Sequence, residues 1–94
     1  MSLEFEWDPK KAAENLRRHH IDFNQAALVF SDPNAFEIFD DTENYGEDRF
    51  ARIGVSEGKI LTVVYTGREG GVRIISARKA TRNEQEDYRR QTRI

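Results

Sequence analysis

The chain has 94 residues, of which 37% are apolar and 34% charged, and it contains no cysteine. This length and composition predict one globular domain over residues 1–94 and argue against a disordered chain, while the missing thiol excludes disulfides, thiolate metal sites and a cysteine nucleophile. A net charge of −2 and a pI near 5.7 argue against indiscriminate nucleic-acid binding. The N-terminal MSLEFEWDPKK lacks the apolar stretch of a signal peptide, and the longest near-apolar run, residues 60–65, is too short for a membrane span. We therefore expect a soluble cytoplasmic protein.

Charge is unevenly distributed along the chain. Residues 1–48 hold four basic and twelve acidic residues, a net charge of −8, whereas residues 49–94 hold eleven basic and five acidic residues, a net charge of +6. Either the fold presents two surfaces of opposite sign, one suited to a polyanion and one to a basic partner, or the two halves neutralise each other through surface ion pairs. The sequence leaves both arrangements open.

The chain begins with a predicted strand and helix. Residues 3–7 alternate apolar and acidic side chains with a period of two, as a half-buried strand does. Asp8 and Pro9 suit the N-cap and first position of a helix that runs to about His20. We expect the apolar residues of this helix to face the core and its basic residues to face solvent; these are Ala12, Ala13 and Leu16 on the inner side, and Lys10, Lys11, Arg17 and Arg18 on the outer side.

A second helix and four strands follow. The helix is predicted to begin after Asp22, which stands three residues before Gln25 in a capping-box arrangement, and to stop at Ser-Asp-Pro, residues 31–33. An acidic, turn-rich loop at residues 40–48 and two short turns separate the strands. The predicted strands are residues 35–39, 50–55, 59–66 and 72–80.

Thr81 and Glu84 form a second capping box, so the last helix is predicted to begin at Arg82 and to run to the C-terminus. The resulting order is βααββββα. Because the strands are joined by short links, they should pair antiparallel. We therefore expect an α+β fold in which a small antiparallel sheet has two N-terminal helices and one C-terminal helix.

The strand at residues 72–80 carries cationic side chains at the ends of an apolar run. Regular alternation places Arg73 and Arg78 on opposite faces of this strand. An arginine so placed rests its stem on apolar surface and leaves its charged fork for a carboxylate or a phosphate. Two interpretations stay open: the forks bind a polyanion, or they pair with acidic residues of the chain. The pairs considered join Arg73, Arg78 and Arg82 to Glu47, Asp48, Glu84 and Glu86.

Four stretches of the chain stand in a characteristic order. They are FEWDPKKAAENLRRHHIDFNQAALVF at residues 5–30, Glu47 with Arg49, KILTVVYTGR at residues 59–68, and VRIISARKATRNEQEDY at residues 72–88. Together they resemble the BrnT family of bacterial toxins from type II toxin-antitoxin modules, over roughly residues 5–90. The resemblance implies a RelE-like fold, with two helices before a small antiparallel sheet and one after it.

The resemblance also implies a function and partners. It implies an endoribonuclease toxin that cleaves RNA, suppresses translation and needs no metal or cofactor. Its cognate antitoxin would be BrnA-like, with a ribbon-helix-helix region, and operator DNA would be reached only through this antitoxin, with a dimer of the toxin inside the complex. The alternative is a non-catalytic binding module that stabilises a DNA-binding antitoxin and contributes to repression of the operon.

One position departs from the family pattern at the end of the first helix. The pattern has a basic residue, a histidine and then a glycine; Arg18 and His19 match the first two, and His20 stands in place of the glycine. A glycine there suits a left-handed helix stop. His20 must therefore adopt a left-handed conformation or end the helix differently.

Metal-independent RNA cleavage requires the ribose 2′-OH to attack the neighbouring phosphate. A base must take its proton, an acid must protonate the leaving oxygen, and cations must neutralise the charge that develops at phosphorus. The hypothesis needs guanidinium groups that meet on one surface. The candidate catalytic residues are Arg78, Arg73, His19, Glu47 and Arg49, with Tyr65 as a secondary acid–base candidate, and the candidate phosphate-binding residues are Arg68, Lys79 and Arg82.

Some of these residues also have structural interpretations. His19 and His20 stand where a cation is favourable at the C-terminus of a helix. The aromatic residues are expected in the core rather than stacked on bases; these are Trp7, Phe23, Phe30 and Tyr88.

Overall fold

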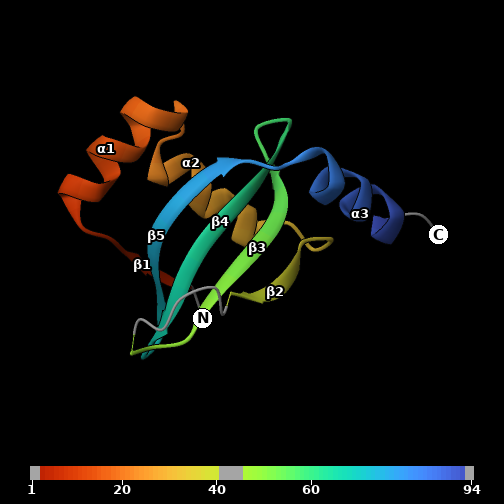
Figure 1. Ribbon diagram of the computed structural model, residues 1–94. Helices are drawn as coiled ribbons and strands as arrows, with labels where there is room; N and C mark the ends of the chain where they lie inside the picture. Colours follow the sequence, from red (N-terminus) through yellow and green to blue (C-terminus); the bar gives the residue numbers. More distant parts are fainter. Residues whose placement is uncertain (1–2, 41–45, 93–94) are drawn as a thin grey trace.

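The computed structural model of the chain describes residues 3–40 and 46–92. Three α-helices, a short 3-10 helix and five strands make up this part of the chain (Figure 1). In chain order they are β1 (Glu4–Glu6), α1 (Pro9–His19), α2 (Phe23–Ala27), η1 (Leu28–Ser31), β2 (Phe36–Asp40), β3 (Arg49–Ser56), β4 (Lys59–Arg68), β5 (Gly71–Lys79) and α3 (Arg82–Thr92). Residues 41–45 of the predicted acidic loop lie outside the described residues. None of the described helices is long and apolar enough to cross a membrane.

The five strands form one mixed sheet in the order β1-β5-β4-β3-β2. Strands β2 to β5 pair antiparallel with their neighbours in sequence, but β1 pairs parallel with β5, and Phe5 lies opposite Val72. The expectation of a wholly antiparallel sheet is therefore wrong. The physical reason is that no hairpin joins β1 to its neighbour: Phe5 packs edge-on against Phe30 of η1, with ring centroids 5.3 Å apart, and this contact helps to hold β1 beside β5.

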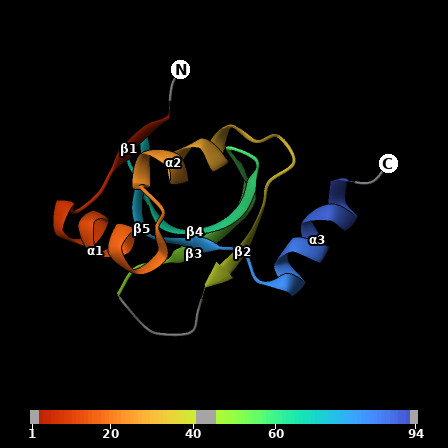
Figure 2. The ribbon, with the colours of Figure 1, turned by 90° about the horizontal axis from the view of Figure 1, so that it is seen from above.

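The helices lie on different sides of the sheet. Seen from above, the sheet curves around α2, while α1 lies beside β5 and α3 lies at the opposite side of the molecule (Figure 2). The main core joins α2 and η1 to the sheet and contains buried residues such as Phe23, Val29, Leu61 and Ile74. A second cluster, formed by Ile53, Ala80 and Tyr88, packs α3 against the other face of the sheet. Of the aromatic residues expected in the core, Phe23 and Tyr88 are buried, and Trp7 and Phe30 are half-buried.

The ends of α1 show how the chain turns toward α2. The carboxylate of Asp8 accepts a hydrogen bond from the amide of Lys10 at 2.9 Å, and Pro9 follows, as the sequence predicted. His20 caps the C-terminus with φ 59° and ψ 30°, and its amide donates to the Leu16 carbonyl at 2.9 Å. His20 thus adopts the left-handed conformation that the glycine of the family pattern would adopt without steric cost.

Asn15 fixes α1 against the sheet. Strand β1 pairs only with Gly71–Arg73, so another group must satisfy the backbone farther along β5. The side-chain amide of Asn15 donates to the Ala77 carbonyl at 2.9 Å and to the Ile21 carbonyl at 3.0 Å, and its oxygen accepts from the Ala77 amide at 3.0 Å. Asn15 therefore replaces a short piece of neighbouring strand.

This contact sets the rotation of α1, which differs from the expected one. Asn15 is the buried residue of the helix, whereas Ala13 is exposed and 47% of Leu16 is exposed. Only Ala12 of the three predicted core positions is partly buried. The helix turns the side chain of Asn15, rather than that of Leu16, toward β5, because the backbone at the edge of β5 needs hydrogen-bond partners.

A β-bulge changes which face the arginines of β5 occupy. Tyr65 of β4 pairs with Ile74, but Val64 pairs with Ser76, so Ile75 is an extra residue on β5. The extra residue reverses the alternation beyond it. Arg73 pairs with Thr66 and Arg78 with Thr62, and these two threonines are an even number of residues apart. Arg73 and Arg78 therefore share a face, and the expectation that they point to opposite faces is wrong.

Candidate functional site

Four arginines share the sheet face that α2 does not cover, and we call this surface the arginine face. It consists of Arg49 of β3, Arg68 of β4, and Arg73 and Arg78 of β5. Arg68 is two residues from Thr66, so it points to the same side as Arg73. Arg49 precedes Phe50, which pairs with Tyr65, and it therefore lies beside Thr66 on this side too. The structure thus brings together four of the predicted site residues.

The strand geometry gives the approximate spacing of these arginines. Thr66 and Thr62, the partners of Arg73 and Arg78, are four residues apart, which corresponds to about 13 Å along β4. Arg49 and Arg73 flank the same point of β4 from two neighbouring strands, so their backbones are about 10 Å apart. Because an arginine side chain is long, the guanidinium groups of Arg49 and Arg73 are within reach of each other, whereas Arg78 lies farther along the sheet.

Two arginines of this face pair with half-exposed carboxylates. Arg73 contacts Glu6 of β1 at 2.6 Å, with side chains 35% and 51% exposed. Arg68 contacts Glu47 at 3.3 Å, with similar exposure. Pairs as exposed as these contribute about 0–1 kcal/mol to stability. A phosphate, which offers the same charge and acceptor geometry, is able to replace such a carboxylate.

Arg78 is held more tightly, by Glu84 at the start of α3. Its two terminal nitrogens contact the two oxygens of Glu84 at 2.7 and 3.1 Å. Glu84 also accepts from Thr62 at 2.9 Å and from the Thr81 amide at 2.8 Å, which completes the predicted capping box. The hydrogen bonds from Arg78 above all, and those from Thr81 and Thr62, lower the pKa of Glu84 from 4.5 to about 2. The proposed pairing of Arg78 with Glu84 is confirmed.

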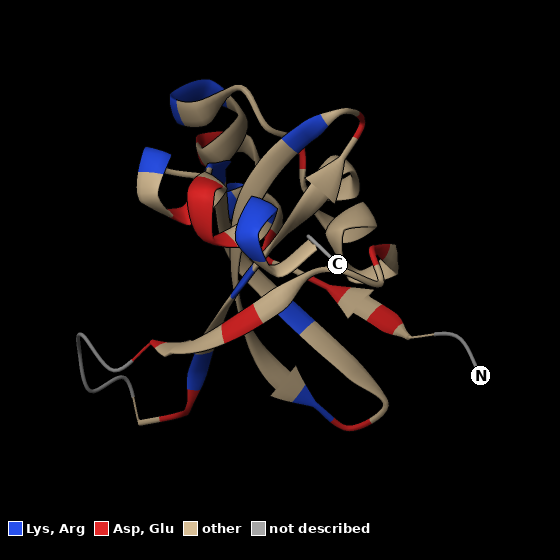
Figure 3. Ribbon diagram, turned by 90° about the vertical axis from the view of Figure 1, so that its right-hand side faces the viewer, with Lys and Arg blue, Asp and Glu red and all other residues tan. Residues whose placement is uncertain are grey.

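The charges of the two halves of the chain meet across the fold. Arg52, Arg68 and Arg73, from the basic half, pair with Glu37, Glu47 and Glu6, respectively, from the acidic half. Figure 3 shows basic and acidic positions side by side along the strands. These contacts favour neutralisation over a separation into two surfaces of opposite sign.

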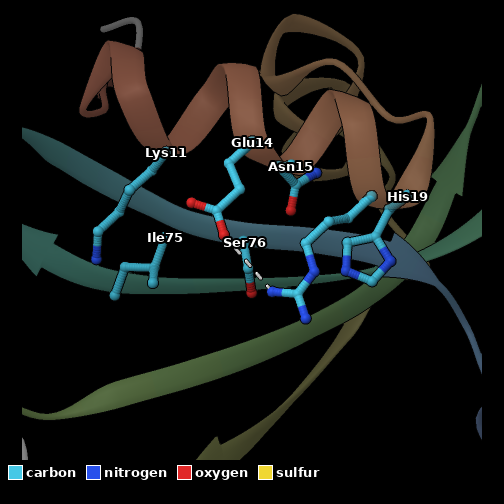
Figure 4. A pocket seen from close by; sticks show the side chains of 7 residues that line it. Lys11, Glu14, Asn15, His19, Ile75 and Ser76 are labelled. Carbon is cyan, nitrogen blue, oxygen red and sulfur yellow. Dashed lines mark ion pairs between the residues drawn. The ribbon is translucent and has the colours of Figure 1, made fainter.

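His19 lies in a pocket between α1 and β5, which we call the α1–β5 pocket. The pocket has a volume of about 210 Å³ and is lined by Lys11, Glu14, Asn15, Arg18 and His19 of α1 and by Ile75 and Ser76 of β5. In Figure 4, the labelled side chains of α1 reach down toward Ser76 and Ile75. Ser76 lies between Arg73 and Arg78 on β5 and points to their face, because it pairs with Val64. His19 therefore stands next to the arginine face, at the edge of the sheet.

The structure leaves two predicted phosphate ligands apart from this face. Lys79 pairs with Leu61 and lies on the opposite side of β5, and it is exposed. Arg82 lies on α3 with 93% of its side chain exposed and pairs with Glu86 at 3.7 Å.

Tyr65, the secondary acid–base candidate, also lies away from the arginine face. It is buried on the face that α2 and η1 cover, where its ring lies 5.0 Å from that of Phe30, centroid to centroid. Its hydroxyl donates to Glu37 at 2.5 Å. Burial, followed by the contact with Glu37, raises the pKa of Tyr65 far above its usual value. Tyr65 therefore stays protonated and out of reach of a ligand on the arginine face.

The candidate site also includes three residues that were not predicted to belong to it, Lys11, Arg18 and Ser76. Lys11 and Arg18 are seven residues apart, two turns of a helix, and so lie on one side of α1. That spacing was visible in the sequence, but both residues were assigned to the solvent side. Ser76 was not recognised because its neighbourhood depends on the bulge.

Comparison with known proteins identifies the family of the chain. No curated protein matches it. Residues 7–84 match the family model described as "Ribonuclease toxin, BrnT, of type II toxin-antitoxin system". The match runs from Trp7, just after β1, to the first turn of α3, so it contains the arginine face and the α1–β5 pocket. The chain therefore belongs to the BrnT family, the ribonuclease toxins of type II toxin-antitoxin systems.

Proposed function

We propose that this protein is an endoribonuclease that cleaves single-stranded RNA on the arginine face, without a metal ion, and thereby inhibits translation. The observation that carries the proposal is the convergence of Arg49, Arg68, Arg73 and Arg78 on one face of the sheet. Membership of the family implies an RNA substrate and an antitoxin partner. Fixed guanidinium groups supply the charge that a phosphodiester binds.

The reaction is an intramolecular displacement at phosphorus. The ribose 2′-oxygen forms a bond to phosphorus as the bond to the 5′-oxygen of the next nucleotide breaks. The proton of the 2′-OH goes to a general base, and a general acid protonates the leaving 5′-oxygen. The products are a 2′,3′-cyclic phosphate and a free 5′-OH. Arg73, with Arg49 beside it and Arg78 farther along β5, neutralises the extra negative charge of the pentacoordinate phosphorus.

His19 is the group best placed for proton transfer. It lines the same pocket as Ser76, and Ser76 lies between Arg73 and Arg78. An imidazole carries two ring nitrogens that can accept or donate a proton. Glu47, the other acid–base candidate, pairs with Arg68 at the end of β4. In this proposal Glu47 holds Arg68, and His19 exchanges protons with the RNA.

The partner proposed for this toxin is a BrnA-like antitoxin with a ribbon-helix-helix region. In this arrangement the toxin reaches operator DNA only through the antitoxin, which also brings two toxin chains into one complex. The toxin acts in the cytoplasm, where its RNA substrate is found. Coexpression with the antitoxin should abolish the growth arrest that the toxin causes alone.

The experiment induces the chain alone in a bacterial host and follows growth and RNA integrity. Wild type should arrest growth and produce RNA fragments with cyclic phosphate ends, also when purified protein is tested with excess EDTA. Arg73→Ala should lower the cleavage rate by about 10²–10³. The same loss is expected for the double variant Arg78→Ala, Glu84→Gln, which removes both partners of the ion pair and leaves no charge unpaired.

Arg89→Ala is the matched control, because Arg89 is exposed near the end of α3. It should keep full activity, and circular dichroism should show all variants folded. Intact RNA in cells that hold folded wild-type protein contradicts the proposal. Full cleavage by folded Arg73→Ala removes Arg73 from the mechanism.

A specific observation favours one second candidate, the non-catalytic binding module. Arg68, Arg73 and Arg78 each contact a glutamate of the chain itself. The arginine face therefore accepts carboxylates, and an acidic antitoxin segment would supply the same groups. Under this alternative the protein binds and stabilises its antitoxin, and growth continues with whole RNA when the protein is induced alone.

A further inference from the structure

The α1–β5 pocket has a wall of positive charge. Lys11 and Arg18 lie on one side of α1, with Glu14 between them. Glu14 contacts Arg18 at 3.7 Å, and their side chains are 55% and 69% exposed, respectively. Such an exposed i, i+4 pair contributes little to stability. An incoming anion therefore meets two cations and one weakly held carboxylate, and it has little to displace.

The pocket is small and opens at the edge of the sheet. Pockets for drug-sized ligands begin at roughly 300 Å³, and this one has a volume of about 210 Å³, so it suits a small group such as a phosphate with part of its ribose rather than a whole nucleotide. Within residues 3–40 and 46–92, no strand pairs with the edge of β5 beyond Arg73, and α1 lies beside this edge instead. A chain that crosses this edge can pass from the arginine face into the pocket.

The bulge of β5 makes the pocket continuous with the arginine face. Ile75, the extra residue, lines the pocket, and so does Ser76, which points to the arginine face between Arg73 and Arg78. In Figure 4, Glu14 lies directly above Ser76, and His19 lies farther along the α1 side of the same pocket. Across the edge of β5, the cations of the sheet therefore flank Ser76, and Lys11, Arg18 and His19 line the α1 side of the pocket.

We propose that the α1–β5 pocket binds the RNA phosphate next to the scissile one. Lys11 and Arg18 hold this second phosphate, His19 and Ser76 face the ribose between the two phosphates, and the arginine face holds the scissile phosphate. The inference rests on the proposed function, because it extends the path of the same RNA. It adds residues of α1 that bind and position the RNA. It also predicts that cleavage needs an RNA long enough to cross the edge of β5.

The chain offers a matched control for this proposal. Lys10 and Arg17 stand one position before Lys11 and Arg18 on the same helix, so they carry the same charges about 100° away around its axis. The double variants Lys11→Ala, Arg18→Ala and Lys10→Ala, Arg17→Ala therefore change the net charge equally. Only the first pair lines the pocket.

The binding test uses a fluorescent single-stranded RNA of ten nucleotides in which every 2′-OH is methylated, so that attack on phosphorus is blocked. Fluorescence anisotropy over a series of salt concentrations gives Kd and its salt dependence. The pocket variant should bind at least tenfold more weakly than wild type, and the magnitude of its log–log salt slope should fall by about 0.7, which corresponds to the loss of one phosphate contact. The control variant should stay within twofold of wild type.

Equal effects of the two double variants, or no binding of this RNA by wild type, would overturn the inference. Cleavage of unmethylated RNA separates this failure from that of the proposed function. If the pocket variant binds and cleaves as wild type does while Arg73→Ala abolishes cleavage, the pocket proposal fails alone. If RNA binding depends on Lys11 and Arg18 but wild type leaves unmethylated RNA whole, the proposed nuclease fails alone.

Discussion

Asn15 is the residue that positions α1, and therefore the α1–β5 pocket. From the sequence, an asparagine inside a helix is expected at the surface, and the residues next to Asn15 in the sequence do not indicate that its side chain pairs with a strand. The pairing depends on β5 having a bare edge beyond Arg73, which depends in turn on how far β1 extends along it. Such non-local facts could not be predicted from the local pattern. The sequence did predict where α1 begins, because an N-cap is a local feature.

Replacement of Asn15 by alanine should destabilise the protein strongly. The variant leaves the amide and carbonyl of Ala77 and the carbonyl of Ile21 without their side-chain partner in a buried place. We expect a loss of about 3 kcal/mol in the free energy of unfolding, measured by urea denaturation. Asn83→Ala, at an exposed position of α3, should change it by less than about 0.5 kcal/mol. A loss below 1 kcal/mol for Asn15→Ala would show that the edge of β5 does not need this amide.

Glycine substitutions at His19 and His20 should have opposite effects. His20 has φ 59° and ψ 30°, a region that costs an L-residue other than glycine about 1 kcal/mol, whereas His19 is still helical. His20→Gly should therefore raise the melting temperature, by roughly 4 °C if the full 1 kcal/mol is gained. His19→Gly should lower it, since glycine disfavours the helix. Differential scanning calorimetry measures both, and a destabilised His20→Gly protein would contradict the assigned cap.

Among the elements, β5 shows that the alternation of residues in a strand does not always predict which face each side chain occupies. Its residues VRIISARK are apolar on both faces in the middle, so a regular strand and a bulged strand have the same sequence pattern. The bulge at Ile75 reverses the faces of all later residues, and this places Arg78 with Arg73. The strand itself was predicted within a residue of its observed bounds. What could not be predicted was its register with β4, which sets the candidate site.

Helix α3, by contrast, begins where its capping box indicates, and its first turn should make stability depend on pH. The pKa of Glu84 is about 2 in the folded protein and 4.5 in a model compound. A lowered folded pKa means that Glu84 stabilises the fold above pH 4.5 and that this contribution is lost as pH falls toward 2. Glu84→Gln, which keeps the capping geometry but not the charge, should therefore lose less stability over this pH range than wild type does.

The comparison is made by urea unfolding at pH 5 and pH 3. Glu86→Gln is the control, because Glu86 makes only an exposed pair with Arg82 at 3.7 Å. Its loss of stability between the two pH values should match that of wild type. Identical losses for wild type and Glu84→Gln would mean that the contacts of Glu84 with Arg78, Thr62 and Thr81 do not persist in solution.

At the scale of the whole molecule, the two oppositely charged halves of the chain are brought into contact. The acidic half supplies Glu6 and Glu47, which pair with Arg73 and Arg68 of the basic half. The composition indicated the imbalance between the halves, but only the sheet order, with β1 beside β5, decides that the charges meet. As a result the arginine face is preorganised by internal carboxylates. In the proposed function, RNA binding exchanges these carboxylates for phosphates. Such an exchange should be weak at high salt.

The salt dependence of RNA binding should reveal how many phosphates the arginine face contacts. For single-stranded RNA, each contact changes the slope of log K against log salt by about 0.7. Arg49→Ala with Arg73→Ala should therefore lower the magnitude of the slope by about 0.7, because the two residues share one phosphate in the proposed site. Arg89→Ala with Arg90→Ala, on the exposed side of α3, should leave the slope unchanged. Fluorescence anisotropy with a methylated RNA decamer measures both slopes. Equal slopes for the two double variants would mean that the salt dependence of RNA binding reflects the net charge of the protein. It would then not depend on where on the sheet the charges lie. A change confined to the sheet variant would mean that the bulged, mixed sheet creates the binding surface.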